Sequence, residues 1–148
     1  MQTTMPEPVV VGAAILDDAT DPTHMLVARR KAPKSLAGYW EFPGGKVEPD
    51  ESLTDGLLRE IREELGVDIQ ILDLIVAPEE AGWQLDNGMR MHVYTAVVTS
   101  GVPRPVIEHD RLEWAQLTAA AMQSLEWIPA DLPIVDAILK QLGGSLAR

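Results

Sequence analysis

Residues 45–67 read GKVEPDESLTDGLLREIREELGV, a glycine turn followed by a run that favours a helix. Apolar residues recur there at every fourth position: Leu53, Leu57, Ile61 and Leu65. This spacing predicts a helix over 52–65 whose apolar stripe lies against a sheet. Asp50 or Ser52 can cap the start of the helix, and Gly66 is typical of its end.

Three carboxylates on this helix lie on one patch of its surface. Glu60, Glu63 and Glu64 are spaced i, i+3 and i+4, so their side chains converge. An acidic cluster alone usually forms a solvated helix face, here with Arg59 and Arg62 as neutralising neighbours. The glycine turn before the helix lets backbone approach a ligand closely. The acidic cluster and the glycine turn together favour a site for Mg²⁺ or Mn²⁺, which prefer oxygen ligands.

The spacing within this stretch is that of the Nudix box. It consists of Gly45, five residues, Glu51, seven residues, Arg59-Glu60, Ile61, any residue, Glu63-Glu64, any residue, Gly66 and Val67. The chain resembles the Nudix hydrolases, and most strongly their MutT-type nucleoside triphosphate pyrophosphohydrolases. The resemblance extends to Ala28-Arg29-Arg30, to residues 40–46, to Glu108 six residues before Trp114, and to residues 129–133.

The resemblance implies a fold and a set of site residues. The fold is the α/β Nudix fold, an α/β/α sandwich with a mixed central sheet. The metal ligands implied are the Gly44 carbonyl, Glu60, Glu63, Glu64 and Glu108. Glu60, Glu63 and Glu64 are the catalytic candidates, with Glu60 as general base. Gly45, Glu51, Arg59 and Gly66 form the scaffold of the box. Arg30, Phe42, Lys46 and Asp131 are candidates for substrate contacts.

The implied reaction is hydrolysis of a (deoxy)nucleoside 5′-triphosphate to the monophosphate and pyrophosphate. Mg²⁺ would be the cofactor, with Mn²⁺ able to substitute, because divalent cations act as Lewis acids and lower the pKa of bound water. A free carboxylate can then accept the proton of the water. The substrates expected are damaged or modified nucleotides, among them 8-oxo-dGTP, dCTP and 5-methyl-dCTP.

Asp131 departs from the pattern of members selective for 8-oxoguanine, which carry asparagine there. An ionised aspartate only accepts hydrogen bonds, so Asp131 should favour a base edge that presents donors. Residues 129–133, read PADLP, also resemble the CTP pyrophosphohydrolases, which favours cytosine nucleotides. The alternative is that Asp131 merely caps the last helix.

Two other functions remain open. One is hydrolysis of a nucleoside diphosphate derivative such as ADP-ribose, a branch that carries an extra N-terminal segment for which the eight residues before the first strand leave little room. The other is a non-catalytic module that senses a nucleotide. Loss of a box glutamate would favour that module, but every glutamate of the box is present.

Composition narrows the class of protein. At 148 residues, with 46% hydrophobic residues, the chain 1–148 should form one domain. A net charge of −11 argues against binding nucleic acid, which needs clustered Lys and Arg. With no cysteine, a thiolate metal site is excluded. We find no signal or membrane segment. We therefore expect a cytoplasmic monomer or weak homodimer acting on a small nucleotide.

The rest of the chain predicts strands around the box. Residues 9–16 and 25–28 should form a hairpin, and residues 40–42, 69–76, 91–99 and 112–117 further strands. Residues 29–39 and 78–88 read as loops, and 133–142 as a terminal helix. Trp40 and Trp114 should belong to the core. The histidines lack metal-ligand spacing, and His109, beside Glu108, is the strongest candidate among them for chemistry.

Overall fold

A mixed eight-stranded sheet organises the computed structural model, which describes residues 8–105 and 108–143. The strands are β1 (Val9–Leu16), β2 (His24–Arg30), β3 (Trp40–Glu41), β4 (Gly44–Lys46), β5 (Asp68–Leu74), β6 (Trp83–Gln84), β7 (Arg90–Ser100) and β8 (His109–Gln116). The helices are α1 (Leu53–Leu65), α2 (Ala119–Gln123), the 3₁₀ turn η1 (Pro129–Asp131) and α3 (Leu132–Gln141).

The central order is β3-β2-β1-β7-β5, with β4 paired to β1, β6 to β7 and β8 to β2. Strand β1 runs parallel to β7 and antiparallel to β2 and β4, which makes the sheet mixed. The predicted hairpin of the first two strands is confirmed.

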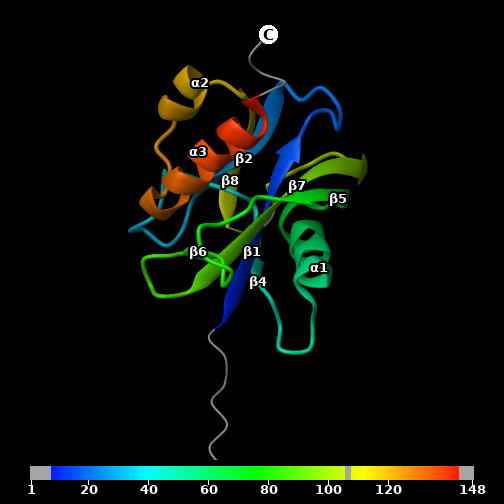
Figure 1. Ribbon diagram of the computed structural model, residues 1–148, viewed down its shortest axis with the longest axis vertical. Helices are drawn as coiled ribbons and strands as arrows, with labels where there is room; N and C mark the ends of the chain where they lie inside the picture. Colours follow the sequence, from blue (N-terminus) through cyan, green and yellow to red (C-terminus); the bar gives the residue numbers. More distant parts are fainter. Residues whose placement is uncertain (1–7, 106–107, 144–148) are drawn as a thin grey trace, which may run out of the picture.

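Helices cover both faces of the sheet, and alternate residues of β1 contact each layer. Val11 and Ile15 belong to the apolar cluster that contains Ile61 of α1. Leu16 belongs to the cluster that contains Ile138 of α3. Figure 1 shows α1 on one side of the sheet and α2 with α3 on the other. This arrangement is the predicted α/β/α sandwich.

Helix α1 begins and ends where its sequence indicates. Ser52, rather than Asp50, is the cap, since its hydroxyl accepts a hydrogen bond from the Asp55 amide. Gly66 ends the helix with a φ of 71°, a conformation that favours glycine. Leu57, Ile61 and Leu65 of the apolar stripe are fully buried. The carboxylates on the adjoining face are thereby held in a fixed direction relative to the sheet.

Several boundaries differ from the prediction. Strand β2 extends through Arg30, so the loop begins later than expected, and β8 begins at His109 rather than Leu112. The helix α2, the turn η1 and the short strand β6 were not expected. These segments are too short for their apolar residues to show a helical or strand periodicity, so the sequence does not predict them.

The core assignment of Trp114 is wrong, whereas that of Trp40 is confirmed. Trp114 is 43% exposed and Trp40 only 7%. Trp114 lies opposite Leu26 on the outer strand β8, on the face that α1 covers. Helix α1 packs mainly over β4, β1 and β5 and has few contacts with β8, which leaves the indole in solvent.

Candidate active site

One cavity of about 810 Å³ collects the predicted metal and substrate residues. Those that line it are Arg30, Phe42, Gly44, Gly45, Lys46, Glu60, Glu63, Glu64, Glu108 and Asp131. Glu51, Arg59 and Gly66, predicted as scaffold, are not among the lining residues. Helix α1 and β4 form one wall, which we call the helix wall. Arg30, Glu41 and Glu108 also line the cavity and, with the buried His109 beside them, form what we call the strand wall.

Two glycines bring the backbone of β4 close to its neighbours. A Cβ on Gly44 would overlap the carbonyl oxygen of Val11 on β1, and the φ of Gly44 is 155°. A Cβ on Gly45 would overlap the Glu60 carboxylate. Position 44 therefore requires glycine, whereas a side chain at Gly45 would displace the Glu60 carboxylate, which packs directly on the turn.

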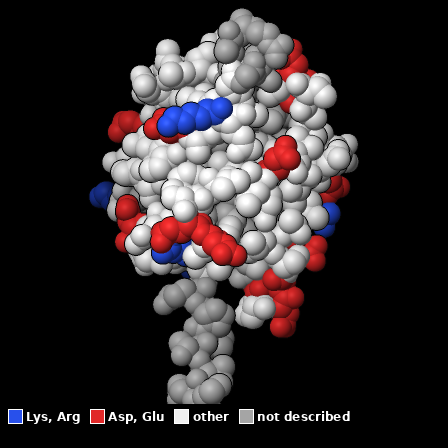
Figure 2. Space-filling view, in the orientation of Figure 1, with Lys and Arg blue, Asp and Glu red and all other residues white. Residues whose placement is uncertain are grey.

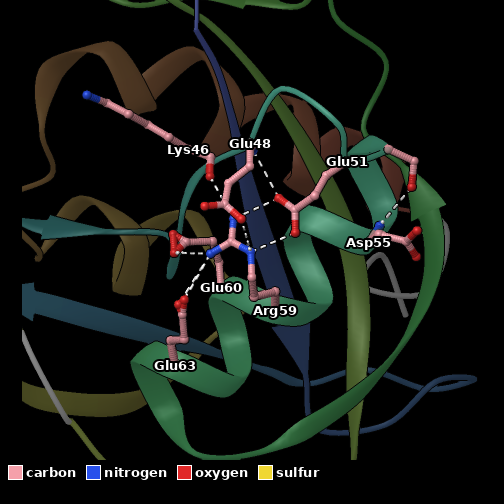
Figure 3. Close-up of polar contacts among 8 residues, drawn as sticks. Lys46, Glu48, Glu51, Asp55, Arg59, Glu60 and Glu63 are labelled. Carbon is pink, nitrogen blue, oxygen red and sulfur yellow. Dashed lines mark hydrogen bonds and ion pairs between the residues drawn. The ribbon is translucent and has the colours of Figure 1, made fainter.

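Arg59 is the centre of the helix wall (Figure 3). Its Nε lies 2.7 Å from one oxygen of Glu51 and its Nη2 lies 2.8 Å from the other, a bidentate pair. Its Nη1 donates to Glu63 at 2.9 Å, and its Nη2 also donates to the Lys46 carbonyl at 3.0 Å. Arg59 therefore joins the helix to the turn.

Arg59 also determines the charge of the Glu51 carboxyl. Hydrogen bonds from Arg59, and then from the Glu48 backbone amide, lower the pKa of Glu51 to about 2. Glu51 is therefore an ionised partner of the scaffold at neutral pH. In Figure 3 the Lys46 side chain extends away from this network, and among the described residues it forms no ion pair.

Glu60 and Glu64 differ from Glu51, because their pKa values are raised rather than lowered. Burial raises the pKa of Glu60, against the opposing charge of Arg59. Burial likewise raises the pKa of Glu64, against the opposing effect of His109. Each also faces neighbouring carboxylates that raise its pKa further. A bound cation would relieve both effects.

The strand wall is built around Arg30. Its Nη1 donates to Glu41 and its Nη2 to Glu108, each at 2.9 Å, and its Nε donates to the Ala32 carbonyl. His109 is buried beside this pair, with Nε2 2.8 Å from Glu41. Arg30 is therefore fully engaged, so that a substrate phosphate at Arg30 would compete with Glu108.

Sequence reasoning missed Glu41 and undervalued His109. Glu41 stands between the buried Trp40 and Phe42, and a charged residue between two aromatic residues of a strand was a usable signal. His109 offered no such signal, because its partners lie 68 residues away at Glu41 and on α1 at Glu64.

Asp131 also lines the cavity, from the turn η1 that leads into α3. It is 5% exposed, and no hydrogen bond from its side chain caps α3. The alternative of a simple helix cap is therefore wrong. Burial, reinforced by the charge of Glu41, raises the pKa of Asp131 to about 7. The carboxyl is thus partly protonated at neutral pH and can donate as well as accept, unlike the ionised form assumed from sequence.

The donor set fits a hard divalent cation in chemistry. Glu60, Glu63, Glu64 and Glu108 line one cavity with the Gly44 backbone, and Glu64 Oε2 is buried without a hydrogen-bond partner. Within residues 8–105 and 108–143, however, no three acidic or histidine side chains already converge on one metal-sized point. The reason is visible in the ion pairs, since Arg59 binds Glu63 and Arg30 binds Glu108.

Comparisons with known proteins find related sequences. A model of the NUDIX domain matches residues 6–138. The Mycobacterium tuberculosis protein named "Putative 8-oxo-dGTP diphosphatase 2" is 36% identical over 140 residues, covering 94% of this chain and 93% of that protein. The CTP pyrophosphohydrolase of Escherichia coli is 34% identical over 116 residues, covering 78% and 82%.

A solved structure resembles the fold as well. The solution structure of the E. coli ORF135 protein superposes with a TM-score of 0.69 at 34% identity, covering 90% of this chain and 89% of that one. Among the described residues of our chain, no helix has the length and apolar character needed to cross a membrane.

Proposed function

Because this chain belongs to the Nudix family, we propose that it hydrolyses (deoxy)nucleoside 5′-triphosphates to the monophosphate and pyrophosphate with Mg²⁺, for which Mn²⁺ can substitute. The observation that supports this proposal best is the shared cavity. Carboxylates suited to a cation line it, and so does the buried Asp131 of η1. A nucleoside triphosphate would need this arrangement, because its phosphates and its base belong to one molecule.

Glu60, Glu63, Glu64 and Glu108, with the Gly44 carbonyl, would hold the cation. When bound, the cation supplies Lewis-acid activation of the phosphoryl group and of a water molecule. Glu60 is our candidate for the general base. It lines the cavity beside the other proposed ligands, where it could accept the proton of a water molecule.

Two basic residues are available for the phosphates. Lys46 lines the cavity, and among the described residues it forms no ion pair. Arg30 also lines it, and Arg30 Nη2 would become available if Glu108 turned to a cation. The Arg30 guanidinium could then bind phosphate oxygens in a forked geometry.

Asp131 and Phe42 would contact the base. Cytosine presents the N4 amino donor beside the N3 acceptor, and a partly protonated carboxyl can match both. This pairing, and the resemblance of residues 129–133 to the CTP pyrophosphohydrolases, support dCTP and 5-methyl-dCTP as preferred substrates over 8-oxo-dGTP. Phe42 is buried and lines the cavity, packing its ring 5.2 Å from that of Trp127.

The charge of the surface supports a free nucleotide rather than a nucleic acid as substrate. Figure 2 shows one face of the molecule on which acidic side chains outnumber basic ones, in line with the net charge of −11. A polyanionic strand would be repelled there, whereas a nucleotide chelated by cations would not.

A panel of nucleotides tests the proposal. CTP, dCTP, 5-methyl-dCTP, dTTP, 8-oxo-dGTP and ADP-ribose would be compared by kcat/KM, with separate detection of orthophosphate and pyrophosphate. We expect pyrophosphate from the triphosphates and the highest kcat/KM for a cytosine nucleotide. Release of orthophosphate with a nucleoside diphosphate would overturn the reaction, and a preference for ADP-ribose would overturn the substrate class.

The same panel with Asp131→Leu, which removes both the donor and the acceptor of the side chain, tests the base contact. A lost hydrogen bond to the base should lower kcat/KM for the preferred nucleotide by about tenfold or more. Unchanged rates and an unchanged ranking would show that Asp131 does not contact the base.

A further inference from the structure

His109 is a buried histidine with one satisfied and one unsatisfied ring nitrogen. The side chain is 2% exposed, at the start of β8. Its Nε2 lies 2.8 Å from Glu41 Oε2. The same oxygen accepts from Arg30 at 2.9 Å, which makes it an acceptor in this contact as well. The Nε2 atom must therefore carry the hydrogen of this contact.

The other ring nitrogen faces helix α1. His109 Nδ1 lies 3.5 Å from Glu64 Oε2. Both atoms are buried and neither has a hydrogen-bond partner among the described residues. At 3.5 Å the contact is longer than an ordinary hydrogen bond, but leaving two buried polar atoms unpaired is unfavourable. If either Nδ1 or Oε2 carries a proton, a small movement would let the two atoms form a hydrogen bond, and neither would then be unpaired.

From this geometry we propose that His109 is a positioning residue for Glu64: held from behind by Glu41 and Arg30, its ring fixes one carboxylate oxygen of Glu64 and leaves the other to face the cavity. The inference rests on the proposed cation site. Residues behind a metal ligand fix its orientation in this way, and their loss commonly weakens the metal affinity 10- to 100-fold. His109 would also connect the strand wall to the helix wall.

Two substitutions separate the two nitrogens. The amide of Asn branches where Nδ1 lies, so His109→Asn retains a polar group toward Glu64. The amide of Gln extends to the position of Nε2, so His109→Gln retains the contact with Glu41 alone. His92→Gln is a matched control, because His92 is a partly buried histidine of β7 that does not line the cavity.

Binding of Mn²⁺ to the purified proteins, measured by calorimetry without nucleotide, is the first test. We expect His109→Gln to weaken binding about tenfold or more, His109→Asn to retain most of the affinity, and His92→Gln to match the wild type. Wild-type binding by His109→Gln, or an equal loss in both His109 variants, would overturn the inference.

Coupling to Glu64 tests whether His109 acts through that residue. In a Glu64→Gln background, His109→Gln should change the Mn²⁺ affinity little, since the group it positions is already altered. An undiminished effect in that background would overturn the inference. Failure of the wild type to bind Mn²⁺ would instead overturn the proposed cation site.

A second measurement needs no histidine variant. In the metal-free protein, nitrogen-15 NMR of His109 should show that Glu64→Gln shifts the Nδ1 resonance while leaving Nε2 nearly unchanged. An unchanged Nδ1 resonance would show that the ring and Glu64 do not interact, whether or not the enzyme uses a cation.

Discussion

The two walls of the cavity both hold carboxylates with an arginine, but they are assembled differently. On the helix wall, Arg59 binds Glu51 and Glu63, and its side chain is 29% exposed. On the strand wall, Arg30 binds Glu41 and Glu108, which come from separate elements, and is 14% exposed. One wall is built from the continuous segment 44–65, whereas the other brings together residues far apart in the sequence and exists only once the sheet has formed.

Glu64 lies where the two walls meet, and its substitution should have the largest effect. Glu64→Gln removes a charge from the proposed cation site, so kcat at saturating Mg²⁺ should fall by more than the roughly 100-fold seen for residues behind a ligand. Glu63→Gln should act in the same direction. Steady-state kinetics would measure both, with the exposed Glu80→Gln as control.

The stability of metal-free Glu64→Gln should not fall, in contrast to its kcat. Burial raises the pKa of Glu64, so the ionised side chain is unfavourable in the folded, metal-free protein. Urea unfolding of metal-free Glu64→Gln should therefore show a stability equal to or above that of the wild type. Near wild-type kcat in this variant would show that Glu64 does not bind the cation.

Substitution of Asp131 should have the next largest effect, which is a change in how the stability depends on pH. Its folded-state pKa of about 7 lies above the ordinary value of 3.8, so its stabilising contribution is complete below about pH 3.8 and is lost as the pH rises through 7. Asp131→Asn stays neutral throughout. The metal-free variant should gain stability relative to the wild type between pH 4 and 7, by at most about 1.4 kcal/mol per pH unit.

Urea unfolding at several pH values, as the difference between variant and wild type, isolates this effect from other titrating groups. A difference that does not change with pH would contradict the raised pKa of Asp131. The control Asp136→Asn, on the exposed side of α3, shows what the same substitution does at the surface.

The arginines themselves test the comparison between the walls. Lysine cannot reproduce the forked contacts of arginine, so both Arg30→Lys and Arg59→Lys should lower stability. Arg30→Lys should cost about 2 kcal/mol, because its hydrogen bonds to charged partners are more shielded from water. Arg59→Lys should cost less, since solvent screens an exposed network.

Urea unfolding in the absence of metal would rank the two variants. A larger loss for Arg59→Lys would mean that the local network of the helix wall, rather than the strand wall, is the more stabilising of the two.

This difference also explains what the sequence could reveal. The helix wall follows from spacing, because the period of Leu57, Ile61 and Leu65 fixes the direction of the carboxylates, and Ser52 and Gly66 mark the ends. The strand wall depends on pairing of β2 with β3 and β8, which no local pattern encodes. Glu41 and His109 were accordingly missed or undervalued.

Trp114 shows the same limit from the core. Its type and its alternation along β8 predict burial, but burial also requires a neighbour that covers the strand, and α1 lies over β1 and β5 instead. The protonation of Asp131 likewise depends on enclosure by segments distant in sequence.

The smallest effect we predict concerns the cap of the helix wall. Ser52→Ala removes the hydroxyl that accepts from the Asp55 amide and should lower stability by about 1 kcal/mol. The apolar stripe still holds α1 on the sheet, so kcat and KM should stay at wild-type values. Urea unfolding and kinetics on the same preparation would check both, with the exposed Ser35→Ala as control. A fall in kcat without a larger loss of stability would show that the start of α1 also orients the carboxylates, and that the helix wall is less self-sufficient than its contacts indicate.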